Sequence, residues 1–330
     1  MELLTLPIAD RLLMGVCAEL LKQSRPLAQT VKAAIKQASI IKATRPLFAI
    51  AALLGLVSAA HATDTRVEKP IFIHGKNVQQ ITVYAWERNG TLIHAFSGDG
   101  QQIPDDAAKY DVRRFQFPEA QFREIVFAKG VRIYPHATHN QDIISYTLSG
   151  RRAQIVNDRV WEADVGDFLF YPAGSIHHGE ALLDSVNVEI GVTHPDTPGD
   201  DGVWVSDRAT SETPVAEWLA AGKARIAYGT EAAKAPFKAA HFSIKVFQLG
   251  RYTVEEVHMA KGTKILRGLA AVPANELMYM IKGRLRVTVG EATDEAVAGD
   301  AFREIAGQIY GSEALDDSTY IGIVLPTVVK

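Results

Sequence analysis

The chain has 330 residues, of which 47% are hydrophobic and 22% are charged, enough for one large or two medium domains with apolar cores. The formal net charge of −3 argues against a basic nucleic-acid-binding protein, and the hydrophobic content argues against a wholly disordered chain. The single cysteine, Cys17, excludes a disulfide framework and a cysteine-based zinc site.

The first 62 residues have the pattern of an export signal. Residues 46–62 contain no Asp, Glu, Lys or Arg, Lys42 and Arg45 lie just before them, and the run ends in Ala-His-Ala. A basic start, a short apolar run and small final residues are typical of a secretory signal peptide, here cleaved after Ala62. The run is shorter than the roughly 20 residues of a membrane span; an uncleaved anchor is the alternative.

The segment upstream of the signal is long and basic, with six basic and no acidic residues between Leu20 and Arg45. Either the true start lies near residues 40–45 or the leader is unusually long, so residues 1–62 are set apart from the fold. The remaining 268 residues hold no cysteine and have 28 basic against 35 acidic residues. We therefore predict a periplasmic or secreted protein without a membrane span after cleavage.

Strand-like runs begin soon after the predicted cleavage site. Three of them (IFIHG, ITVYAW and TLIHAF) lie in residues 69–96, and we interpret them as strands added to the edge of a first barrel. Farther on, short runs rich in β-branched and aromatic residues alternate with Gly, Asn and Asp about every 8 to 12 residues. This spacing favours an all-β sandwich or barrel, and we predict a first domain over residues 63–195.

A linker is predicted over residues 196–240. It opens near a loop rich in Pro, Gly and Asp. Thr213 is placed to cap a helix that begins at Pro214 and ends near Ala221, where a glycine follows. We therefore expect a short helical linker between two β domains.

The second half of the chain repeats the first. Gly166–Ser185 and Gly299–Ser318 share 10 of 20 residues at a constant offset of 133 positions. Self-similarity of this kind indicates two copies of one structural unit. The copies cover about 115–195 and 247–328, and the second lies in a predicted second domain, 241–330.

The first copy carries a motif of a known family. The spacing G-x5-P-x-G-x2-H is matched at every fixed position from Gly166 to His177, and Gly130, His136 and Gly150 match parts of G-x5-H-x-H-x3/4-E-x6-G. These residues resemble the cupin superfamily. With the repeat, the chain from residue 63 onward resembles a bicupin. The resemblance implies two tandem cupin-type antiparallel β-barrels, each a double-sheet, jelly-roll-like structure.

The family pattern is incomplete in both copies. Thr138 stands where the family has its second histidine, with His139 next to it, and Ile143 stands where the family has glutamate. In the second copy, Tyr310 replaces the repeated histidine, and Glu276 alone keeps the glutamate position. We therefore expect a degenerate second barrel with a structural role.

The resemblance implies one divalent metal ion in the first barrel, with His136, His139 and His177 as ligands. Imidazole is a common ligand for Mn, Fe, Zn, Ni and Cu, and three histidines from two strands leave the open position that catalysis needs. Asp142 is a further candidate ligand in place of the missing glutamate, provided that a bulge turns it inward.

Three further residues are candidates for substrate binding. Along an extended strand, Arg132 and Tyr134 share the face of His136, so both would point into the barrel with it. His178 directly follows the predicted ligand His177. These side chains would suit an anionic or hydroxylated small molecule.

Two functions follow from this site. The first is a metal-dependent enzyme of cupin type, an oxidoreductase or lyase resembling dioxygenases and decarboxylases, with a small oxygenated or anionic substrate. The second is a non-catalytic cupin that binds or senses a sugar or a carboxylate. No phosphate-loop, dinucleotide or serine-hydrolase motif supports another chemistry. We expect no nucleic-acid partner, and, because bicupins often assemble through barrel faces, a homo-oligomer is a candidate assembly.

Overall fold

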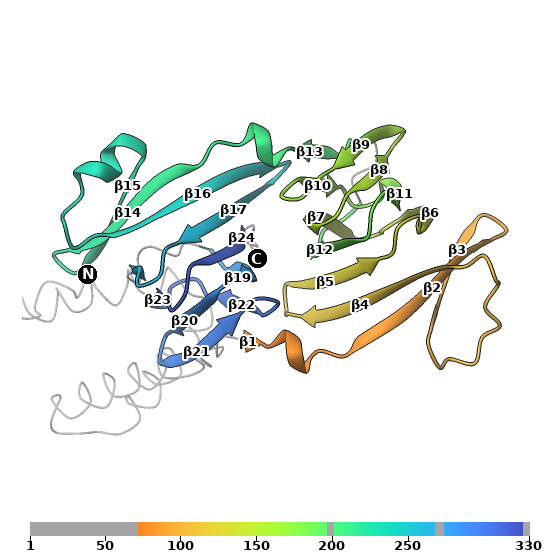
Figure 1. The fold of residues 1–330 in the computed structure, drawn as a ribbon, viewed down its shortest axis with the longest axis horizontal. Coiled ribbons are helices and arrows are strands. Elements are labelled where there is room, and N and C mark those ends of the chain that lie inside the picture. The colour runs from red at the N-terminus through yellow and green to blue at the C-terminus, as the bar shows by residue number, and fades with distance from the viewer. Residues whose placement is uncertain (1–71, 197–200, 268–273, 326–330) are drawn as a thin grey trace, which may run out of the picture. The chain divides into compact units, whose positions relative to one another are not determined.

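The computed structural model describes residues 72–196, 201–267 and 274–325. The predicted leader, signal peptide and cleavage site lie outside these residues. Within them, no helix is long and apolar enough to cross a membrane. The described chain consists of 24 strands and three short 3₁₀ turns, arranged in four antiparallel sheets (Figure 1). This confirms the all-β prediction.

The first half forms two facing sheets. The first large sheet has the strand order β13-β10-β7-β12-β5-β4-β2-β3, and the first small sheet has the order β6-β11-β8-β9. The strands are β2 (Gln80–Arg88), β3 (Thr91–Phe96), β4 (Ala108–Gln116), β5 (Ala120–Phe127), β6 (Arg132–Ala137), β7 (Gln141–Ser149), β8 (Arg152–Val156), β9 (Arg159–Ala163), β10 (Phe168–Tyr171), β11 (Ile176–Ala181), β12 (Ser185–Thr193) and β13 (Val203–Val205).

The second half has the same arrangement. The second large sheet has the order β1-β22-β19-β24-β17-β16-β14-β15, and the second small sheet has the order β18-β23-β20-β21. The strands are β1 (Phe72–Ile73), β14 (Thr213–Ala220), β15 (Lys223–Tyr228), β16 (Ala240–Leu249), β17 (Tyr252–Met259), β18 (Lys264–Arg267), β19 (Glu276–Lys282), β20 (Arg284–Val289), β21 (Ala292–Val297), β22 (Ala301–Glu304), β23 (Tyr310–Ala314) and β24 (Ser318–Val324).

The two halves exchange short strands. β1 precedes the first half but pairs with β22 of the second, and β13 precedes the second half but pairs with β10 of the first. An equivalent aspartate holds each exchange: Asp300 Oδ1 accepts from the Gly75 N–H at 2.8 Å, and Asp167 Oδ1 accepts from the Asp207 N–H at 2.9 Å. The repeat therefore reaches upstream of the predicted starts, residues 115 and 247. The predicted edge strands β2 and β3 are confirmed, whereas β1 joins the other half.

The predicted linker helix is wrong. Thr213–Ala220 is the strand β14, which pairs with β15 and β16, so this part of the predicted linker 196–240 belongs to a sheet. Ala221 and Gly222 have φ angles of 52° and 73° and form the turn to β15, as Asn89 and Gly90 do between β2 and β3. The predicted helix does not form because the backbone groups of β14 make their hydrogen bonds with β16 instead.

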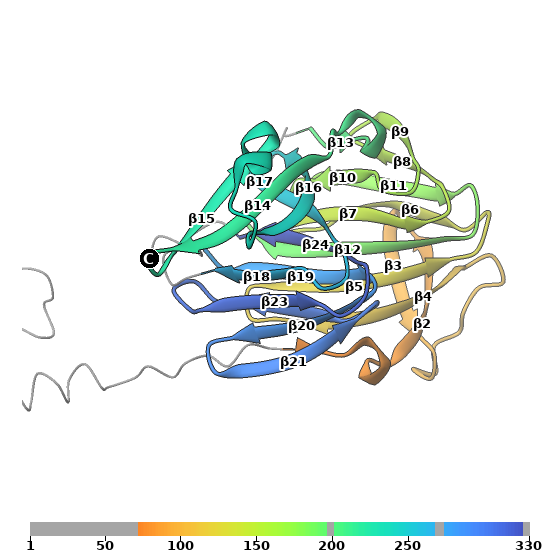
Figure 2. The ribbon, with the colours of Figure 1, turned by 60° about the vertical axis from the view of Figure 1, so that its left-hand side comes forward.

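The two large sheets pack face to face and enclose an apolar layer (Figure 2). Phe115 and Phe122 enter it from the first half, and Phe247 and Leu277 enter it from the second; all four are fully buried. A second apolar cluster fills the space between the second large and small sheets. The order of layers is therefore small, large, large, small.

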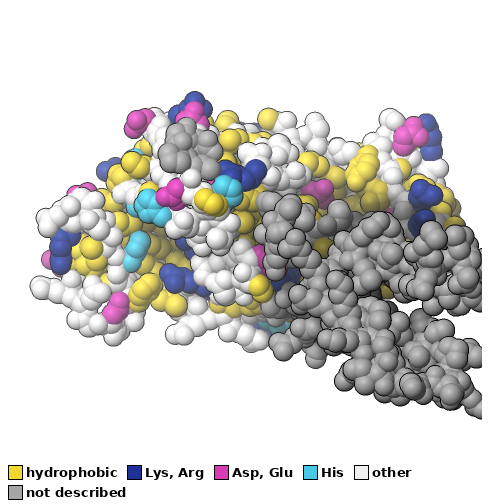
Figure 3. Space-filling model, turned by 180° about the vertical axis from the view of Figure 1, so that it is seen from behind, with side chains coloured by type: hydrophobic (Ala, Val, Ile, Leu, Met, Phe, Trp, Pro, Cys, Tyr) yellow, Lys and Arg dark blue, Asp and Glu magenta, His cyan; other side chains and the backbone are white. Residues whose placement is uncertain are grey.

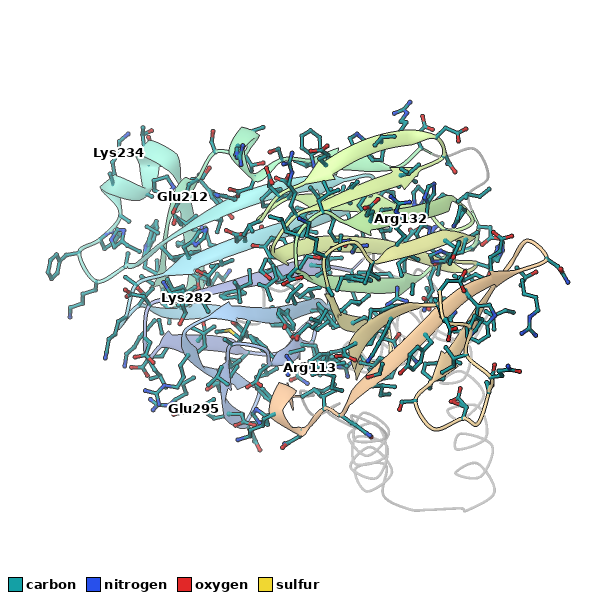
Figure 4. All side chains as sticks on the ribbon, turned by 45° about the vertical axis from the view of Figure 1, so that its right-hand side comes forward. Arg113, Arg132, Glu212, Lys234, Lys282 and Glu295 are labelled. Carbon is teal, nitrogen blue, oxygen red and sulfur yellow. The ribbon has the colours of Figure 1, made fainter. Side chains whose placement is uncertain are left out.

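Two buried tyrosines cross the apolar layer at equivalent positions of the repeat. Tyr146 donates to Glu256 Oε2 at 2.9 Å, and Tyr279 donates to Glu124. Arg113, labelled in Figure 4, donates from Nε to Glu124 Oε1 at 3.1 Å. These hydrogen bonds satisfy carboxylates that the packing of the halves removes from water.

Removing either tyrosine hydroxyl should destabilise the protein. Tyr146→Phe or Tyr279→Phe leaves a buried carboxylate oxygen without its donor, which costs about 1–3 kcal/mol. Urea denaturation measures the free energy of unfolding. Tyr84→Phe, at a half-buried position on β2, is the control and should change stability by less than about 0.5 kcal/mol. Equal stability of all three variants would contradict this prediction.

Candidate functional site

A cavity of about 390 Å³ lies between the first large and small sheets. Most of the charged and polar side chains of the first barrel's interior line it, and histidines are visible on this part of the molecule from behind (Figure 3). The polar and charged lining residues are His94, Tyr110, Arg114, Arg123, His136, Thr138, His139, Arg152, Gln154, Tyr171, His177, His178 and Glu189.

His136 and His177 face each other across two neighbouring strands. They are direct partners in the pairing of β6 with β11, and their ring centres are 4.3 Å apart. Tyr171 stacks on His177 at 4.8 Å with an interplanar angle of 4°. Nδ1 of His136 donates to the Tyr134 carbonyl at 2.9 Å, and Nδ1 of His177 donates to the Ser175 carbonyl at 3.2 Å. This assignment leaves both Nε2 atoms as acceptors.

Burial favours the neutral form of three of the histidines that line the cavity. Burial, and after it the nearby His136, lower the pKa of His177 to about 3. Burial also lowers the pKa of His136. The pKa of His94, on β3, is lowered by burial and then by His136. His94 was not predicted as a site residue because it shows no ligand spacing and reaches the cavity from an added hairpin.

His139 does not join this pair. Its side chain is 67% exposed, and its Nδ1 lies 2.8 Å from Asp196 Oδ2. The other Asp196 oxygen accepts from the Asn140 N–H at 2.8 Å. These two contacts, with the backbone hydrogen bond first, lower the pKa of Asp196. His139 therefore lies at the rim of the cavity with its ring held by a surface carboxylate.

Asp142 is part of the contact between the two halves. Its Oδ1 accepts from the Ala173 N–H at 2.8 Å, and its Oδ2 accepts from the Tyr252 hydroxyl at 2.8 Å and lies 3.3 Å from Arg251 Nε. No bulge turns it inward, so ordinary strand alternation places it on the face opposite the cavity. It does not replace the missing glutamate.

The predicted inward orientation of Arg132 and Tyr134 is also wrong. Between the pairs His136–His177 and Ile133–Gly179, two residues of β6 lie opposite one residue of β11, which is a β-bulge that inverts the alternation. Ile133 lines the cavity instead. The side chain of Arg132, labelled in Figure 4, is 76% exposed and pairs with Glu180 at 2.8 Å. Tyr134 is not among the lining residues, whereas His178 is.

Arg152, at the start of β8, is a cavity residue that the motifs do not indicate. It is only 4% exposed, and its guanidinium lies 4.2 Å from the centre of the Phe127 ring. With their amide groups oriented by the hydrogen-bond network, Gln154 and Asn187 accept from it at 2.7 Å and 2.9 Å. Burial lowers the pKa of Arg152. No carboxylate in the described ranges forms an ion pair with it.

The other charges of the cavity are also mainly positive. Arg123 pairs with Glu189 at 3.3 Å, and Glu189 is the single carboxylate among the described lining residues. Arg114 lies directly opposite Arg123 in the pairing of β4 with β5, and its guanidinium lies 5.3 Å from the Phe96 ring centre. Among the described lining residues, three arginines therefore face one carboxylate.

Comparison with known proteins identifies the type of fold. No family model and no curated protein sequence matches the chain. AerE from Microcystis aeruginosa is similar in structure over 66% of this chain and 92% of its own, at 12% identity and a TM-score of 0.50. Oxalate decarboxylase from Bacillus subtilis, solved in a study of its Mn(II) centres, is similar over 77% of this chain and 76% of its own, at 10% identity and a TM-score of 0.51. The chain has the bicupin fold.

Within this bicupin fold, the described residues do not complete the metal site that the sequence predicts. Thr138 takes the place of one histidine, and Ile143, 1% exposed, lies in an apolar cluster in place of glutamate. In the described ranges, no group of three or more His, Cys, Asp or Glu side chains has a geometry that could hold a metal ion. Catalytic zinc sites typically use three protein ligands, and here the structure pairs two imidazoles.

The second barrel of the bicupin has an apolar interior. Leu285, Val287 and Tyr310 stand at the repeat positions of Arg152, Gln154 and His177. All three are at most 1% exposed and belong to the apolar cluster between the second large and small sheets. The charged cavity is therefore a feature of the first barrel, and the two barrels differ in interior chemistry rather than in strand arrangement.

The buried His177 should make stability depend on pH. Its pKa in the folded protein, about 3, lies below that of an unfolded histidine, so the unfolded state binds more protons in acid. The stability is therefore present above about pH 6.5 and falls by about 1.4 kcal/mol per pH unit below it.

Denaturant titrations of the wild type and His177→Phe between pH 7.5 and 4.5 measure this slope. The variant should lose the part of the slope that comes from His177, whereas His241→Gln, at an exposed position, should keep the full slope. Identical slopes in the wild type and His177→Phe would refute the assignment.

Proposed function

We propose that the first barrel binds a small carboxylate in its cavity without a resident metal ion, as a binding or sensing cupin. The observation that carries this proposal is Arg152, a buried cation that lines the cavity and forms no ion pair with any carboxylate of the described residues. The proposal follows the second of the two functions that the sequence suggests.

A buried charge without a counter-ion is costly, and the cost falls when an opposite charge binds. A guanidinium offers parallel N–H donors that match the two oxygens of a carboxylate. The amides of Gln154 and Asn187 together with the Phe127 ring hold the Arg152 side chain in place, so little side-chain entropy is lost on binding. Arg114 adds a second cation at an exposed position of the lining, which favours the approach of an anion.

The metal-dependent enzyme remains the second candidate because of one observation. Each of the two facing histidines donates from Nδ1 to a backbone carbonyl, and such a hydrogen bond also orients the histidine ligands of metal sites. The donor set nevertheless lacks a third protein ligand, and the buried Arg152 supplies positive charge to the same cavity. These features support the binding function.

Replacing Arg152 should weaken carboxylate binding. We expect Arg152→Gln to lower the affinity for carboxylates by about tenfold to a hundredfold, because a charge-assisted hydrogen bond is lost. Calorimetric titration with acetate, hexanoate and benzoate measures the affinity of each variant. Arg151→Gln is the matched control, since the neighbouring Arg151 is 46% exposed and pairs with Asp164 on the surface. If no carboxylate binds to the wild type, or if both variants bind equally, the proposed function fails.

Metal removal should leave this binding intact. We expect purified protein to contain well under one divalent metal ion per chain, and we expect protein treated with a chelator to bind the carboxylates with unchanged affinity. Elemental analysis and calorimetry measure the two quantities. About one metal per chain in the wild type, lost in His177→Phe, would instead support the metal-dependent enzyme.

The location and assembly of the protein remain proposals. The basic leader, apolar run and Ala-His-Ala sequence before residue 63 support export to the periplasm or the outside of the cell. The expected homo-oligomer and the absence of a nucleic-acid partner rest on the sequence alone. In the exported state, the ligand would be a small molecule from the cell's surroundings.

A further inference from the structure

The cavity has two polar ends that differ in chemistry. Arg152 lies at the start of β8, and Val156, at the end of the same strand, pairs with His177. Four residues of extended strand separate their Cα atoms by about 13 Å. Gln154, midway along this strand, accepts from the Arg152 guanidinium and donates to the Tyr171 hydroxyl, and the Tyr171 ring stacks on His177. The guanidinium and the histidine pair are therefore the two polar ends of one row of side chains in the cavity wall, and a single ligand that contacts both lies along this row.

The Arg152 end binds an anion, and this step rests on the proposed function. The Arg152 guanidinium is buried and lies over the Phe127 ring at 4.2 Å. Its donors suit the two oxygens of a carboxylate.

The second end offers hydrogen-bond acceptors instead of donors. The Nδ1 atoms of His136 and His177 both donate to backbone carbonyls, so their Nε2 atoms carry lone pairs. An acceptor pair of this kind repels a second carboxylate and matches a ligand that brings an O–H donor.

Between the two ends, much of the wall is apolar. Val112, Ile125 and Phe127 of the first large sheet are at most 6% exposed, and Ile133 packs against the same cluster. All four line the cavity. Its volume of about 390 Å³ lies within the range of pockets that hold drug-sized ligands and is far more than a two-carbon diacid fills. Apolar ligand surface placed against this wall gains affinity by leaving water.

We infer that the ligand of this barrel is a hydroxy acid with an apolar body, bound by its carboxylate at Arg152 and by its hydroxyl at the His136–His177 pair. The apolar body lies against Val112, Ile125 and Ile133. This arrangement separates the site chemically from one built for a small diacid such as oxalate.

The test is a calorimetric comparison of matched ligands at pH 7.5. The ligands are oxalate, three unbranched alkanoates (butanoate, hexanoate and octanoate) and the three acids of the same lengths that carry a hydroxyl at the far end. We expect affinity to rise from oxalate to the longer acids. For the acid whose length spans the cavity, the hydroxyl should raise the binding affinity about threefold to tenfold, the typical gain from one hydrogen bond.

Two histidine variants then show where the hydroxyl binds. In His177→Phe the hydroxyl's gain should vanish while the alkanoate affinity stays within about twofold. An aromatic side chain fits this position because Tyr310 occupies the equivalent one in the second barrel. His136→Gln, which keeps a polar side chain, is the second variant should the first fail to fold. Thermal unfolding verifies the folded state of each.

The outcomes separate the two proposals. If alkanoates bind and Arg152→Gln weakens them, but oxalate binds as tightly or the hydroxyl gain persists in both histidine variants, the hydroxy-acid inference is overturned and the carboxylate-binding function stands. If none of the acids binds to the folded wild type, both are overturned.

Discussion

The apolar layer between the two large sheets determines which face of each strand is left for chemistry. Phe115 and Phe122 are buried in this layer, and because strand side chains alternate, their neighbours Arg114 and Arg123 face the cavity instead. A slip of one residue would exchange these faces. The buried hydrogen bonds of Tyr146 and Tyr279 to glutamates of the opposite half help to specify this register.

One strand arrangement serves two kinds of interior in this molecule. The second barrel is filled by side chains such as Met278, Leu285 and Tyr310, so its sheets are held by the burial of apolar surface. The first barrel contains a cavity lined by three arginines and several histidines. Its interior therefore has less apolar packing and more polar surface than that of the second barrel. The likeness to solved bicupins therefore describes the strands that both barrels share, whereas binding chemistry depends on the side chains of one barrel.

Positive charge inside a small barrel can be provided by an ion or by a side chain. In the first barrel it is provided by Arg152, whose guanidinium is held by amide oxygens and an aromatic ring. The neighbouring His136 and His177 stay neutral through burial. The cavity thus combines a permanent cation with neutral acceptors, the combination on which the proposed ligand binding rests.

The sequence by itself determined the repeat and the β class, which follow from the internal similarity, from glycines at turns and from short runs of β-branched residues. The cupin-type barrels and the meeting of His136 with His177 were implied by the resemblance to the cupin family. The predicted helix failed because Thr213-Pro214 suits both a helix start and a strand, and the sheet edge provided by β16 decides between them.

The tertiary structure alone decided the rest of the site. A bulge in β6 turned Arg132 and Tyr134 away from the cavity, and contact with Tyr252 and Arg251 of the other half took Asp142 out of it. Arg152 follows Gly150 closely but stands at no fixed position of the motifs, and His94 reaches the cavity from β3, far in sequence from them. Local spacing predicts which residues lie on one strand, but only the pairing of distant strands determines which side chains meet.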